Sequence, residues 1–82
     1  MRNSYKYCVR NSEGKNIGHL LINELPELQI KIAHFYDLDT ALPHVFDNFP
    51  LSKNYFSIAQ ELMNKVGKNK PFQLVEGLNL EI

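Results

Sequence analysis

The side chains whose type and spacing suggest a nucleophile with its base, or a set of metal ligands, are few: Cys8, His19, His34, His44, Asp37 and Asp39. In one register of the hairpin expected near the N-terminus, Cys8 lies beside His19, and a thiol next to an imidazole is a usable nucleophile and base. Such a pair needs a third group that orients the base, and the sequence offers none. We therefore interpret Cys8 as a small hydrophobic residue and predict no catalytic residue.

Metal binding is not favoured by the spacing of the acidic and imidazole groups. His34, Asp37 and Asp39 lie within six residues, but on a strand these spacings direct the side chains to different faces. The two aspartates are typical of turns and helix caps. His44 has no partner that the sequence reveals, so we predict no metal site.

The glycines do not form a cofactor-binding loop. Gly18 lies in Asn16-Ile17-Gly18-His19, whereas phosphate and dinucleotide loops need further glycines and a following helix. A minimal acyltransferase would share the expected order of strands and helix, but it needs a glycine-rich turn before its main helix. The sequence has 49–52, Phe-Pro-Leu-Ser, at that place. We predict that the chain binds no cofactor and is not an enzyme.

The element around which these residues must be arranged is an amphipathic helix over about 52–66. Its apolar residues recur every three or four positions: Tyr55, Phe56, Ile58, Ala59, Leu62, Met63 and Val66. Ser52 is the expected N-cap, and Gly67 is the expected left-handed residue that ends the helix.

Segments of alternating polarity predict the sheet on which this helix packs. Residues 4–10, 17–22 and 28–36 each read as a strand, and the short turns between them give a three-stranded antiparallel meander. Residues 37–51 are harder to assign, with a short helical turn expected around Pro43 to Phe46. The segment 71–75 could be a helical turn or a strand.

The predicted fold is therefore α+β, with a three-stranded antiparallel meander packed on one main helix and a short helical or extended C-terminal segment. A final strand is plausible where Leu78, Leu80 and Ile82 alternate with polar residues. Eighty-two residues are enough for a single small domain, 1–82.

Composition favours a protein partner over a nucleic acid or a membrane. Nine basic and nine acidic residues cancel, so no overall field attracts an anionic polymer or bilayer, and little repulsion opposes association. A lone cysteine, no apolar run near ~20 residues and no signal-like N-terminus predict a cytoplasmic protein.

Aromatic residues are abundant for so short a chain: Tyr5, Tyr7, Phe35, Tyr36, Phe46, Phe49, Tyr55, Phe56 and Phe72. Stacking on single-stranded nucleic acid would call for interleaved basic residues, but those of this sequence are scattered. A core of this size cannot enclose nine rings, so we expect some of them in a protein contact surface.

One pattern resembles a known family. The segment 46–50, Phe-Asp-Asn-Phe-Pro, is followed by a helix and then by 71–75, Pro-Phe-Gln-Leu-Val. This order resembles the N-terminal subdomain of HipA-like serine/threonine kinase toxins, in which a Phe-x-Asn-Leu-Leu-Pro segment leads into a helix. The segment 17–20, Ile-Gly-His-Leu, is similar to the family's hydrophobic-Gly-x-Leu pattern, whereas Phe49 stands where the family has a leucine pair.

The resemblance implies a partner as well as a fold. No kinase catalytic loop or metal-binding motif fits in this chain, so it looks like the subdomain encoded as a separate subunit, as in HipBST systems. There the separate subunit acts as an antitoxin that binds the kinase toxin and restrains it. The residues expected to contact the kinase are Phe46, Asn48, Phe49, Tyr55 and Phe72.

Two other classes of protein stay open. Another small inhibitor or immunity-type protein, for example a phage anti-defence factor, would have much the same sequence features. A small enzyme that uses Cys8, His19 or His34 is the less favoured alternative.

Overall fold

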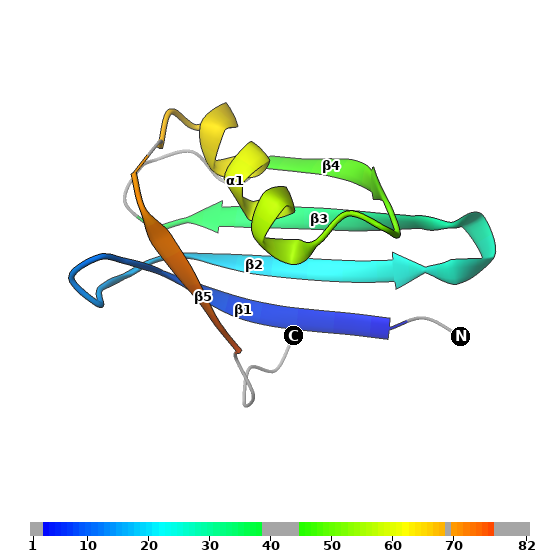
Figure 1. Ribbon diagram of the computed structural model, residues 1–82, viewed down its shortest axis with the longest axis horizontal. Coiled ribbons are helices and arrows are strands. Elements are labelled where there is room, and N and C mark those ends of the chain that lie inside the picture. Colours follow the sequence, from blue (N-terminus) through cyan, green and yellow to red (C-terminus); the bar gives the residue numbers. More distant parts are fainter. Residues whose placement is uncertain (1–2, 39–44, 69, 77–82) are drawn as a thin grey trace.

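The computed structural model describes residues 3–38, 45–68 and 70–76. It shows an antiparallel sheet in the order β4-β3-β2-β1-β5, with one α-helix on one of its faces (Figure 1). The elements are β1 (Asn3–Asn11), β2 (Asn16–Leu25), a 3-10 helix η1 (Pro26–Leu28), β3 (Ile30–Asp37), β4 (Val45–Pro50), α1 (Tyr55–Lys65) and β5 (Phe72–Glu76). No helix in these described ranges combines the length and apolar character needed to cross a bilayer.

The α+β class and the predicted β1–β2–β3 meander are confirmed, but the sheet is wider than expected. β4 pairs with β3 and β5 pairs with β1, so the meander gains a strand at each edge. The helical turn expected up to Phe46 is wrong at Val45 and Phe46, which begin β4. Of the two options for 71–75, the strand is correct, and the strand proposed from Leu78 to Ile82 lies outside the described residues.

The helix begins later than its apolar pattern suggested. Asn54, not Ser52, is the N-cap, and its side-chain oxygen accepts a hydrogen bond of 2.8 Å from the Ser57 N–H. Ser52 lies in the turn that joins β4 to α1, which a hydrogen bond from Lys53 N–H to the Pro50 oxygen closes. The predicted end is confirmed, because Gly67 adopts a positive φ of 79°.

The core lies between the sheet and α1, which packs across β3 and β4 (Figure 1). Its buried hydrophobic residues are Val9, Ile17, Leu20, Ile22, Ala33, Phe35, Phe49, Ile58, Ala59, Leu62 and Met63. Phe56, which the helical spacing assigned to the apolar stripe, is instead 50% exposed. It stacks on Phe72 of β5, with ring centroids 4.4 Å apart.

Gly18 has a steric function in this core. A Cβ at this position would lie 2.9 Å from the backbone oxygen of Tyr36 and closer still to the ring of Phe35. The ring of Phe35 is completely buried, so it has no room to move away. Gly18 therefore allows the Phe35 ring to approach the β2 backbone.

Candidate binding face of the sheet

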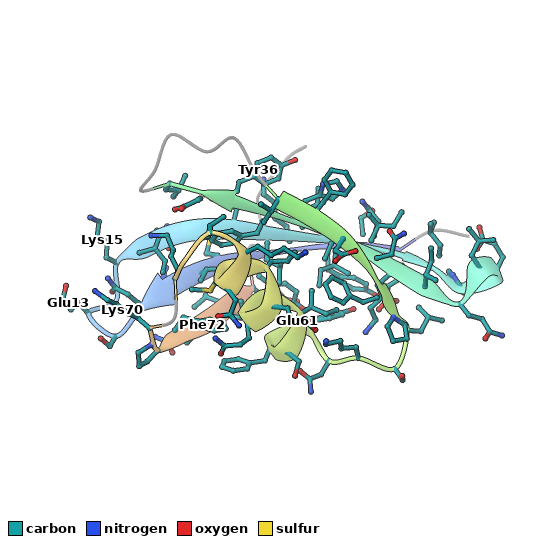
Figure 2. The ribbon with its side chains drawn as sticks, turned by 90° about the horizontal axis from the view of Figure 1, so that it is seen from above. Glu13, Lys15, Tyr36, Glu61, Lys70 and Phe72 are labelled. Atoms are coloured by element: carbon teal, nitrogen blue, oxygen red, sulfur yellow. The ribbon has the colours of Figure 1, made fainter. Side chains whose placement is uncertain are left out.

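Strand alternation gives the sheet two faces of different character. One face packs against α1, and we call the other the open face. Cross-strand pairing places these residues of β1 to β5 on the open face: Ser4, Lys6, Cys8, Arg10, His19, Leu21, Asn23, Leu25, Ile30, Ile32, His34, Tyr36, Phe46, Asn48, Pro50, Gln73 and Val75. Figure 2 shows Tyr36 on the side of the sheet away from α1, whereas Phe72 lies on the helix side.

Two ladders of neighbouring side chains cross the open face. One consists of Val75, Cys8, His19 and Tyr36 on β5, β1, β2 and β3. The other consists of Lys6, Leu21, His34 and Phe46 on β1, β2, β3 and β4. Neighbouring strands lie about 4.8 Å apart, so each ladder is a continuous row of side chains.

Three rings form a stacked group at the β3–β4 end of these ladders, and we call them the aromatic row: Tyr36, His34 and Phe46. The His34 ring lies 6.4 Å from that of Tyr36 and 5.4 Å from that of Phe46, with interplanar angles of 17° and 29°. Tyr36 is 39% exposed and Phe46 is 60% exposed. Large rings held in a fixed arrangement at the surface are typical of a binding site for another macromolecule.

Cys8 and His19 do occupy directly opposite positions on β1 and β2. The thiol is free and half-buried, and no hydrogen bond joins it to the imidazole within the described ranges. Burial lowers the pKa of His19, and the positive charge of Lys6 lowers it further. The register that the sequence analysis considered is therefore formed, and the two residues are cross-strand neighbours.

Of the other candidate ligands, His34 and Asp37 are described by the structure, and they lie on opposite faces of the sheet. His34 lies on the open face, while Asp37 is 7% exposed on the helix side, where Lys68 Nζ is 3.6 Å from its carboxylate. Asp39 and His44 lie outside the described residues. Within the ranges that the structure covers, no three histidine, cysteine or acidic side chains are grouped so that they could hold a metal ion.

The five predicted contact residues do not form one surface. Phe46 and Asn48 are exposed on the open face, but Phe49 is 6% exposed in the core. Tyr55 and Phe72 are half-buried on the helix side. Residues on a strand that are three apart point to opposite faces, so Phe46 and Phe49 of β4 could not serve the same surface.

Tyr55 instead belongs to a structural cluster between the start of α1 and the sheet. Its hydroxyl donates a hydrogen bond to Glu24 of β2, and Lys31 Nζ lies 4.5 Å from the centre of its ring. The same Nζ donates to the backbone oxygen of Lys53, which satisfies a lysine that is only 6% exposed. Burial and then the bond to Glu24 raise the pKa of Tyr55.

Sequence reasoning missed Tyr36, His34 and Leu21 as members of the open face. The apolar alternation of Ile30 and Ile32 suggests a core-facing pair, but the structure places both residues on the open face. The register of β3 against β2 decides this orientation, and it is set by burial of Ala33 and Phe35. The signal in the sequence was the alternation of Ala33 and Phe35 with His34 and Tyr36.

No protein-family model, curated protein or solved structure matches this chain. The resemblance to HipA-like kinases therefore stays a prediction from the sequence segments. The structure places 46–50 on one edge strand of the sheet and 72–75 on the other.

Proposed function

We propose that this chain is a non-enzymatic protein-binding subunit and that the open face is its docking surface. The observation that carries the proposal is the aromatic row, in which Tyr36 and Phe46 hold large exposed surfaces in a fixed stack with His34. Residues of this kind at the centre of an interface contribute most of its binding energy. Because the rings already stack on one another, less side-chain entropy is lost on docking than for unstacked side chains.

We further propose that the partner is a HipA-type serine/threonine kinase toxin and that the chain is its antitoxin-like inhibitor. The resemblance in 46–50 supports this choice, since Phe46 and Asn48 of that segment are exposed on the open face. In this mechanism, the rigid sheet docks on the N-lobe of the kinase. It inhibits by hindering the geometry of the nucleotide site or of the activation loop.

The test is co-expression with a HipA-type kinase from the same genome, followed by co-purification and an assay of kinase toxicity. We expect a stable complex and relief of toxicity. Phe46→Ala should weaken binding at least tenfold, because loss of a hot-spot ring costs ~2 kcal/mol or more. Phe56→Ala is the matched control, since it removes a 50% exposed ring from the helix side of the molecule.

Two results would contradict the proposal. A kinase that neither co-purifies with the chain nor loses toxicity in its presence is not its partner. A complex that tolerates Phe46→Ala but not Phe56→Ala would move the docking surface to the helix side.

A further inference from the structure

The acidic side chains of the described strands are confined to one face of the sheet, which also holds the buried Lys31, whereas the charges on the other face are basic. The strand carboxylates within the described ranges all lie on the helix side: Glu24, Asp37, Asp47 and Glu76. Asp47 is 3.3 Å from Lys65 of α1, and Glu24 accepts the hydroxyl of Tyr55. No described strand directs a carboxylate to the open face.

The charged residues of the open face are both basic and both on β1. Lys6 stands at one end of the ladder that ends at Phe46. Arg10 lies beside Gln73 of β5, and its Nε donates a 3.2 Å hydrogen bond to Asn16. Although the whole chain has zero net charge, its open face is positive at the β1 end and aromatic at the β3–β4 end.

From this sorting we infer that the open face fits a protein surface whose apolar centre is bordered by carboxylates. The inference rests on the proposed function and specifies the chemistry of the partner. Lys6 and Phe46 lie three strand spacings apart, or about 14 Å. The acidic residues of the partner therefore lie about that far from the pocket that receives Phe46.

A protein surface suits this face better than a single-stranded nucleic acid. A nucleic-acid strand carries a phosphate at every nucleotide, and its binding sites line the backbone path with cations beside the stacking rings. Here the two cations lie on one strand, and the aromatic row two to three strands away has hydrophobic neighbours, Leu21 and Ile32. One apolar patch with charge at a single border is the arrangement of a protein interface.

The experiment compares two double variants in the complex with the HipA-type kinase. Lys6→Glu/Arg10→Glu reverses both charges of the open face. Lys15→Glu/Lys70→Glu makes the same change in net charge at exposed positions, in the β1–β2 turn and before β5 (Figure 2). We expect the first variant to bind at least about tenfold more weakly, because like charges opposed across an interface are strongly unfavourable, and the second to bind within about twofold of wild type.

Salt dependence and a neutral variant complete the test. Raising the salt from about 0.05 to about 0.5 M should weaken wild-type binding but not binding of Lys6→Met/Arg10→Met, because salt screens the attraction that the neutral variant lacks. Urea unfolding of each variant establishes that it is folded.

The outcomes separate this inference from the proposed function. A complex that forms with equal affinity for all variants and at both salt concentrations overturns the inference and leaves the proposed function standing. No complex for any form, wild type included, overturns both. Binding of a fluorescent single-stranded oligonucleotide that Lys6→Glu/Arg10→Glu and Phe46→Ala abolish would assign the face to nucleic acid and also overturn the inference.

Discussion

Phe46 and Phe49 of β4 provide a matched pair that separates binding from stability. Phe49 is 6% exposed and belongs to the core, whereas Phe46 is 60% exposed on the open face. Phe49→Ala should cost about 3–5 kcal/mol, the usual range for a buried phenylalanine. Phe46→Ala should cost less than about 1 kcal/mol, since the ring that it removes is already mostly exposed and stacks on His34 at the surface.

The size of the difference makes it measurable. A domain of this length has a free energy of unfolding of roughly 4–12 kcal/mol at 0.05–0.15 kcal/mol per residue. Phe49→Ala therefore removes a large part of it. With a urea m-value near ~1 kcal/mol/M, its unfolding midpoint should fall by about 3 M or the protein should be unfolded without urea, while that of Phe46→Ala should fall by less than about 1 M.

Urea unfolding followed by far-UV circular dichroism measures both midpoints, and kinase binding is measured on the variants that stay folded. The expected pattern for Phe46→Ala is near-normal stability with weak binding. Equal destabilisation by the two variants would refute the assignment of Phe46 to a solvent-facing surface. Normal kinase binding by a folded Phe46→Ala protein would refute its role in docking.

Two further predictions concern the start of α1. Asn54→Ala should lower the free energy of unfolding by about 1 kcal/mol because it removes the N-cap. Ser52→Ala is the control and should leave the free energy of unfolding nearly unchanged. Equal effects of the two substitutions in thermal unfolding would contradict the assignment of the cap to Asn54. Tyr55→Phe tests how the stability of the protein depends on pH. The pKa of Tyr55 is raised in the folded state, so the folded protein keeps a proton that the unfolded chain loses above about pH 10. Stability from this group is present below pH 10 and falls as the pH rises beyond it. The urea midpoint of wild type should therefore exceed that of Tyr55→Phe by less at pH 11 than at about pH 9. Tyr5→Phe is the control. A difference in midpoint that stays constant over this range would refute the contribution of the Tyr55 phenol to stability.

The sequence was sufficient for the parts of the fold that local periodicity determines. β1 to β3 and α1 each contain a long run of one period, and the glycine that ends the helix is identifiable by its type. β4 and β5 are short edge strands. β5 pairs with β1, which is distant in sequence, and β4 pairs with β3 across a segment whose sequence has no clear period. Pairing of that kind leaves little local signal.

The candidate site was predicted in part. Phe46 and Asn48 are on the open face, but grouping them with Phe49 required 45–50 to be something other than a strand. Lys31 explains why the orientation of β3 is hard to infer from sequence, since charged residues ordinarily face solvent. Its ammonium group instead reaches the Lys53 oxygen and the ring of Tyr55 at the end of α1, and its aliphatic stem lies in the interior.

The close approach at Gly18 changes how its sequence motif is interpreted. Any protein that places a large ring directly over the neighbouring strand needs a residue without a side chain there. The glycine of the Ile-Gly-His-Leu segment therefore meets a requirement of interior packing, and unrelated chains with the same ring placement would converge on a glycine there. Exposed positions such as Phe46 and Asn48 have no such requirement, so evidence for shared ancestry or a shared partner must come from them.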